Sequence, residues 1–154
     1  MQWYTIDKEK VDLEEQLAMH VSSDVIIHIG SDAQANGKEK ADFVTVVCVH
    51  HVGQGGRVYY WKDIKVPTHS LWEKLYGETE RSLRIATQLS NHFGADIVDK
   101  ILVHVDANPN TKYASSKYVQ NLAGMVMGYG FKYVLKPDAF AASHCADHIV
   151  KNKN

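Results

Sequence analysis

The sequence lacks a disulfide or zinc pattern and any long apolar run. Only two cysteines occur among 154 residues. Cys48 and Cys145 stand alone in apolar surroundings, which predicts buried thiols. No apolar stretch approaches the ~20 residues that a membrane span needs, and Met1–Tyr4 does not begin a signal peptide. We therefore expect a cytoplasmic protein with no membrane partner.

The chain also lacks an excess of charge of either sign. It has 17 basic and 18 acidic residues, with a formal net charge of -1. This balance gives no global attraction to nucleic acid, so such a partner would need a local basic patch. The 45% hydrophobic content supports a real core and excludes a disordered chain.

The hydrophobic pattern predicts one α/β domain over residues 24–154, after a lead-in over residues 1–23 with a weak helix at 8–20. Short β-rich runs predict strands at 25–30, 43–49, 58–66, 101–105 and 131–135. Helical periodicity predicts helices at 70–93, 110–128 and 137–151. The order β-β-β-α-β-α-β-α predicts a mixed five-stranded sheet, with an antiparallel meander, two parallel crossover units and helices on its faces.

Aspartates are expected where two neighbouring strands of this sheet end. Asp32 follows the first predicted strand and Asp106 ends the fourth. Carboxylates brought together there would repel unless a cation lies between them, and Mg²⁺ prefers such oxygen ligands. Taken singly, either residue is better explained as a loop or cap aspartate, whereas the two together in this topology favour a metal site.

The helices offer further acids. In the last predicted helix, Asp147 lies on a stripe that could point toward Asp32, whereas Asp138 better suits a helix cap. In the first long helix we choose Glu78, which is nearest the apolar face, with Glu80 as the alternative. A solvated charged face explains any of these glutamates about as well.

Four segments in this order resemble the ribonuclease H superfamily and, more narrowly, the YkuK-type family of bacterial ribonuclease H-like proteins. They are Ile29-Gly-Ser-Asp-Ala-Gln34, Glu78-Thr-Glu-Arg-Ser-Leu83, Val103-His-Val-Asp-Ala-Asn-Pro109, and Lys136-Pro-Asp-Ala-Phe-Ala-Ala-Ser143 with Ala146-Asp147.

The resemblance implies a ribonuclease H-like fold and a metal-dependent nuclease of RNA or DNA. Asp32, Glu78, Asp106 and Asp147 would bind Mg²⁺ or Mn²⁺, and two ions would hydrolyse a phosphodiester. Ribonuclease H itself has glycine directly after the first aspartate, where this chain has Ala33. A basic substrate-gripping segment is also not evident between Gly128 and Asp138, so specificity for RNA–DNA hybrids is not implied.

Several histidines accompany the acids. His144 precedes Asp147 by one helical turn and is a candidate for proton transfer, although a partly exposed histidine explains it as well. His28 and His104 share strand parity with Gly30 and Asp106. They are expected beneath the acids as partners of the metal ligands, or as satisfied core histidines.

Two functions remain open. The first is a metal-dependent nuclease acting on RNA, RNA–DNA hybrid or single-stranded DNA, which retention of three aspartates favours. The second is a non-catalytic nucleic-acid- or partner-binding domain that keeps the fold, which the near-neutral charge favours. Asn110 is expected to begin a helix whose amides could hold a phosphate. Candidate grips for a phosphate backbone are Lys38, Lys40, Lys112, Lys117 and Lys151.

Overall fold

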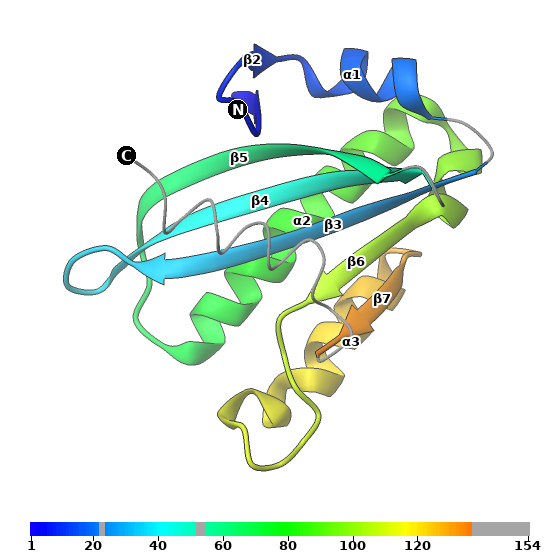
Figure 1. Cartoon of the computed structure of the whole chain (residues 1–154). Helices are drawn as coiled ribbons and strands as arrows, with labels where there is room; N and C mark the ends of the chain where they lie inside the picture. Colours follow the sequence, from blue (N-terminus) through cyan, green and yellow to red (C-terminus); the bar gives the residue numbers. More distant parts are fainter. Residues whose placement is uncertain (22–23, 52–54, 137–154) are drawn as a thin grey trace.

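A computed structural model describes residues 1–21, 24–51 and 55–136. Its centre is one sheet with the strand order β2-β1-β5-β4-β3-β6-β7 (Figure 1). The strands are β1 (Trp3–Thr5), β2 (Lys10–Val11), β3 (Val25–Ala35), β4 (Lys40–His51), β5 (Gly55–Pro67), β6 (Ile101–Val105) and β7 (Lys132–Leu135). The α-helices are α1 (Leu13–His20), α2 (Leu71–Phe93) and α3 (Val119–Gly128), and the 3₁₀ helices are η1 (Ala95–Lys100) and η2 (Ala114–Tyr118).

The sheet has seven strands, so the prediction of five was too low. The five expected strands correspond to β3 through β7, and the lead-in adds β1 and β2 at the edge of β5. Strands of three and two residues are too short to show alternation, which is why the pattern did not reveal them. Tyr4 of β1 stacks on Tyr60 of β5, with ring centroids 5.6 Å apart.

The strand directions agree with the predicted mixed sheet. β3, β4 and β5 form an antiparallel meander, while β6 runs parallel to both β3 and β7. The predicted end of the first strand at Gly30 was wrong, because β3 continues to Ala35. The Asn-Gly pair at 36–37 is a strong turn signal in the sequence, and the turn lies there: Gly37 has a φ of 83°, and the N–H of Asn36 donates to the carbonyl of Lys40.

The longer β3 decides where the acids can meet. Pairing between β3 and β6 ends at Gly30 and His104, so the C-terminal part of β3 extends past the end of β6 (Figure 1). Asp32 lies in this extension, inside the strand rather than after it, and pairs with Val44 of β4. Beyond Gly30, no strand of the described residues pairs with this edge of β3 beside the end of β6.

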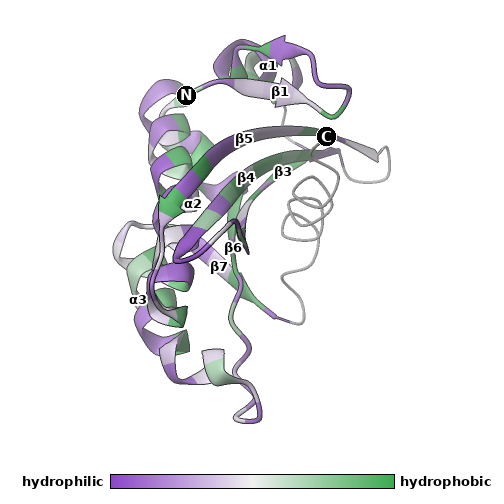
Figure 2. Cartoon of the chain, turned by 90° about the vertical axis from the view of Figure 1, so that its left-hand side faces the viewer, coloured by the Kyte–Doolittle hydropathy of each residue, from purple (hydrophilic) through white to green (hydrophobic). Residues whose placement is uncertain are grey.

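The helices α2 and α3 lie side by side on one face of the sheet (Figure 2). Their apolar side chains form the main core with the strand residues that point to this face, and α1 adds Leu13 and Leu17 to it. The α2 helix begins as predicted, because the Ser70 side chain accepts a hydrogen bond from the N–H of Glu73 at 3.1 Å. Near the start of α2, Lys74 lies 3.9 Å from Asp106, which directly follows β6, so this part of the helix lies close to the end of that strand.

The helix predicted from Asn110 begins later than expected. Residues 110–113 form a turn, η2 follows, and α3 begins only at Val119. The side chain of Asn110 accepts from the N–H of Lys112, and that of Asn108 accepts from the N–H of Asn110. Asparagines satisfy the backbone of turns in this way, so the predicted phosphate-binding helix start at Asn110 was wrong. The predicted last helix, with Asp138, His144, Cys145, Asp147 and Lys151, lies outside the described residues.

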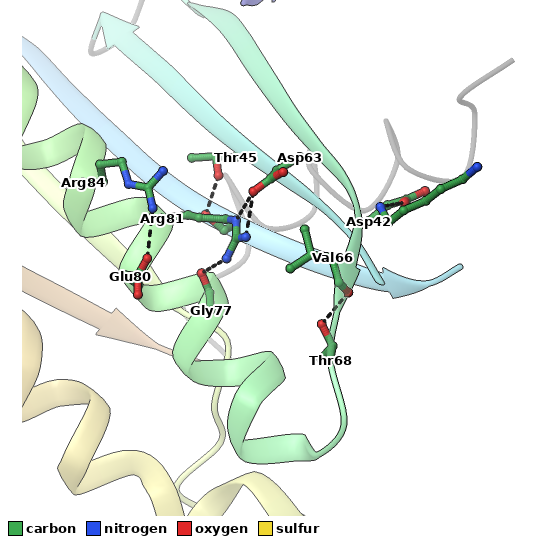
Figure 3. A network of polar contacts seen from close by, with 11 residues as sticks. Asp42, Thr45, Asp63, Val66, Thr68, Gly77, Glu80, Arg81 and Arg84 are labelled. Carbon is green, nitrogen blue, oxygen red and sulfur yellow. Dashed lines mark hydrogen bonds and ion pairs between the residues drawn. The ribbon is translucent and has the colours of Figure 1, made fainter. Parts of the chain in front are cut away.

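A buried arginine joins α2 to β5 (Figure 3). Arg81 donates from Nε and Nη2 to Asp63 at 3.2 and 2.7 Å, and from Nη1 to the carbonyl of Gly77 at 3.0 Å. Its guanidinium lies 3.9 Å from the centre of the Phe43 ring. Gly77 makes this approach possible, because a Cβ there would lie 2.9 Å from that ring.

Candidate metal centre

Three acidic side chains meet at the edge of β3 beside the end of β6. Asp32 comes from the extension of β3, Glu78 from α2, and Asp106 directly follows β6. One carboxylate oxygen of each lies within 4.8 Å of those of the others. Such proximity is unfavourable for three charges without a cation, so the contacts of each acid decide what the cluster can do.

Glu78 is the most buried of the three, with 3% of its surface exposed. Its Oε2 accepts from the backbone N–H of Ala33 at 2.9 Å and from Lys74 Nζ at 3.1 Å. Its Oε1 is buried and has no hydrogen-bond partner among the described residues. Burial raises the pKa of Glu78 to about 8, against the opposing effect of Lys74 and with help from Asp106 and Asp32. One oxygen of this carboxylate is therefore available to a ligand.

The helical phase of α2 turns its three glutamates in different directions. Glu80 points outward and pairs with Arg84 at 3.0 Å, its side chain being 44% exposed. Glu73 accepts from the N–H of His69 at the start of the helix. Only Glu78 of these three lies beside Asp32 and Asp106.

The two aspartates are tied to different neighbours. Asp32 is buried and accepts from the side-chain amide of Gln34 at 3.1 Å. Asp106 pairs with Lys136 through Oδ1 and lies 3.9 Å from Lys74 through Oδ2. Lys136 follows β7, which neighbours β6, so the sheet order brings it to the end of the strand that Asp106 follows.

Lys74 is a partner that the sequence analysis missed. Burial tends to lower its pKa, but Glu78, Asp106 and Asp32 outweigh this effect and raise it, so the ammonium stays charged. The available indication was its spacing, because residues four apart on a helix face one another. Lys136 was missed as well.

The ribonuclease H-like family model matches residues 10–151. The chain belongs to the ribonuclease H-like family. This confirms the resemblance drawn from the four sequence segments. Searches of curated proteins and of solved structures found no match. Among the helices of the described residues, none has the length and apolarity to cross a membrane.

The acid cluster of this ribonuclease H-like protein fits a divalent cation. Carboxylate oxygens are the ligands that Mg²⁺ and Mn²⁺ favour, and the three side chains converge closely enough to share an ion. The unpartnered Oε1 of Glu78 is an independent sign of fit, because a buried carboxylate oxygen without a donor is costly unless a ligand satisfies it.

Two histidines form a buried pair on the strands that carry the aspartates. His28 Nδ1 and His104 Nε2 are 2.8 Å apart and share one hydrogen bond. Burial lowers the pKa of His104 to about 4 and also lowers that of His28, so both rings are neutral near pH 7. This pair links β3 to β6 four residues before Asp32 and two before Asp106.

The expected lysine grips lie outside the acid cluster. Lys38 and Lys40 are exposed at the β3–β4 turn, and Lys112 and Lys117 are exposed around η2. The last two each lie 5.1 Å from the ring centre of the following tyrosine. Asp147, His144 and Lys151 lie beyond the described part of the chain, so their place in the site stays a prediction.

Proposed function

We propose that this ribonuclease H-like protein is a nuclease that hydrolyses phosphodiester bonds of RNA or DNA with Mg²⁺ or Mn²⁺ held by Asp32, Glu78 and Asp106. The observation that carries the proposal is Glu78, a buried carboxylate with an unpartnered oxygen beside two aspartates. Asp147 is the proposed fourth ligand.

The reaction adds water across one P–O ester bond, giving a phosphate monoester and a free hydroxyl. A bound divalent ion would lower the pKa of a coordinated water and offset phosphate charge. Glu78 and the aspartates would orient that ion, while the ammonium groups of Lys74 and Lys136 add positive charge where the phosphate arrives. His144 is the proposed group that passes a proton to the leaving oxygen.

Substrate affinity should be modest. The proposed contacts with the phosphate backbone come from Lys38, Lys40, Lys112, Lys117 and Lys151. These side chains are few and no helix start at Asn110 assists them, which is why the affinity is expected to be modest. Binding should still weaken as salt increases, because it depends on contacts with charged phosphates.

The proposal is tested with single-stranded RNA, RNA–DNA hybrid and single-stranded DNA, each offered in Mn²⁺. We expect cleavage of at least one substrate, loss of cleavage on chelation with EDTA, and loss in Asp106→Asn. Asp99→Asn is the matched control, because Asp99 is an exposed aspartate in η1. Cleavage that survives in Asp106→Asn would assign the activity to another site or to a contaminant.

The alternative is a non-catalytic binding domain, and one observation favours it. Lys74 and Lys136 already pair with two of the acids, an arrangement that can exist without an ion. A binding assay with Asp106→Asn tests the nuclease. The variant removes a carboxylate that repels the phosphates, so it should bind nucleic acid as well as the parent or slightly better while it no longer cleaves. No cleavage, together with no effect of Mn²⁺ on thermal stability, would favour the alternative.

A further inference from the structure

The acid cluster contains its own cations. Lys74 Nζ lies 3.1 Å from Glu78 Oε2 and 3.9 Å from Asp106 Oδ2, so a single ammonium bridges two of the three acids. Lys136 contacts the other oxygen of Asp106. The two lysines differ in setting, because the side chain of Lys74 is 33% exposed and that of Lys136 is 46% exposed.

Lys74 is held in this position by its helix. It lies one turn before Glu78 on α2, a spacing at which side chains meet. The ammonium also interacts with Asp32, so all three acids act on it. Lys74 thus lies where a cation between these acids is needed.

We propose that Lys74 takes the place of one of the two ions that the family resemblance implies, so that the site binds a single divalent ion. The inference rests on the proposed function. Two divalent ions and two ammonium groups carry more positive charge than the four acids can balance, with Asp147 counted as the fourth, and leave a net charge of +2. Like charges a few ångströms apart repel strongly in a partly buried site, so Lys74 opposes a second ion.

In the reaction, the Lys74 ammonium interacts with the phosphate. It is a compact charge with three donors, suited to the oxygens of a phosphoryl group. Negative charge grows on those oxygens as water attacks, and a fixed positive group stabilises it. Lys74 therefore weakens the binding of divalent ions but assists the cleavage of the substrate.

A purely structural role for Lys74 would give different results in a variant without its charge. If Lys74 only holds Glu78 in place, its removal should disorder the carboxylates and lower both Mn²⁺ affinity and cleavage. The proposal instead predicts changes of opposite sign in the same variant. Lys74→Met is the suitable change, because methionine keeps an unbranched chain and removes the charge.

The experiment measures Mn²⁺ binding to the full chain by calorimetry, with electron paramagnetic resonance to distinguish isolated from coupled ions. The parent should bind one Mn²⁺ and give the spectrum of an isolated ion. Lys74→Met should bind Mn²⁺ at least tenfold more tightly and cleave at least tenfold more slowly. Lys132→Met is the matched control, because this exposed lysine begins β7 at the end of the strand away from the site, and it should resemble the parent.

The outcomes separate this inference from the proposed function. Two ions in the parent, or Mn²⁺ affinity that is unchanged or weaker in Lys74→Met, would overturn the inference alone. Tighter binding with unchanged cleavage would overturn the role of Lys74 toward the phosphate. Absence of any Mn²⁺ binding in the parent would overturn the metal site itself. Lys74→Gln serves as the second variant if circular dichroism shows that Lys74→Met does not fold.

Discussion

The α2 helix carries two clusters of buried charge less than one turn apart, and they are built in opposite ways. Around Arg81, the guanidinium donates from Nε, Nη1 and Nη2 to Asp63 and to the carbonyl of Gly77 (Figure 3). Its face also lies on the ring of Phe43. Around Glu78, three acids crowd together, and one buried oxygen of Glu78 has no hydrogen-bond partner. We call the cluster around Arg81 satisfied, because the guanidinium has its hydrogen-bond partners. We call the cluster around Glu78 incomplete, because one buried oxygen has none among the described residues.

The difference shows how a structural charge and a ligand site can be told apart. A buried polar network with all its partners contributes to stability and leaves nothing for a ligand to supply. An incomplete network costs stability, and a native protein keeps such a cost where another partner completes the site. The prediction is that changes at Arg81 act on folding, whereas changes at Glu78 act on cation binding.

The largest expected effect is the loss of the satisfied cluster. Arg81→Met removes two hydrogen bonds to Asp63 and the contact of a charge with Phe43, and should lower the free energy of unfolding by about 3 kcal/mol. Lys74→Met should cost less, about 1–2 kcal/mol, because the raised pKa of Glu78, about 8, lets this carboxyl take up a proton when its partner is removed. Urea unfolding without added metal measures both, and equal losses would remove the distinction between the clusters.

The second effect is the response to metal. Mn²⁺ at a hundredfold its dissociation constant should stabilise the parent by about 2.7 kcal/mol, because it binds only the folded site. Glu78→Gln should lose most of this shift, since an amide is a poorer ligand, while Glu80→Gln should keep it because Glu80 points outward to Arg84. Melting curves with Mn²⁺ and after chelation measure the shift. The opposite ranking of the two variants would show that Glu78 is not a ligand.

A smaller effect is expected where the satisfied cluster is most tightly packed. Gly77→Ala places a Cβ 2.9 Å from the Phe43 ring and 3.1 Å from Arg81 Nη1. Alanine favours helix by about 1 kcal/mol over glycine, but overpacking of a buried ring costs about 1–3 kcal/mol. The cost of the clash should exceed the gain in helix propensity, so the free energy of unfolding in urea should fall by about 1 kcal/mol. Gly124→Ala is the control, because a Cβ there meets nothing within 4 Å and should stabilise α3.

The sequence predicted the parts of this molecule that have a regular period. The long α2 helix, the meander and the parallel strands follow from hydrophobic spacing, and the phase of α2 turned Glu78 inward as expected. Features without a period were missed. β1 and β2 are too short to alternate, and Gly30 was taken for the end of a strand in which it is a paired residue.

The partners of the acids were harder to predict than the acids. Lys136 reaches Asp106 only because β7 neighbours β6, a contact between residues thirty positions apart. The hydrogen bond from Ala33 to Glu78 depends on β6 ending before β3 does. Asp147 was placed in the site by its helical stripe and by the family resemblance, and His144 by its spacing from Asp147. Both lie outside the described residues and stay predictions.

The last expected effect is no larger and concerns the histidine pair, which links the two strands that carry the aspartates. The bond between His28 and His104 joins neutral rings and should contribute about 1 kcal/mol, the usual net value for a hydrogen bond between uncharged groups. His28→Phe, His104→Phe and the double variant form a cycle whose coupling energy isolates this bond. Because the bond holds β6 against β3 close to Asp106, each single variant should also weaken Mn²⁺ binding slightly, by about twofold to fivefold. A coupling energy near zero with unchanged Mn²⁺ affinity would make these histidines ordinary core residues. The positions of the three acids would then be set by the ends of β3 and β6 and by α2, without a contribution from the histidine pair.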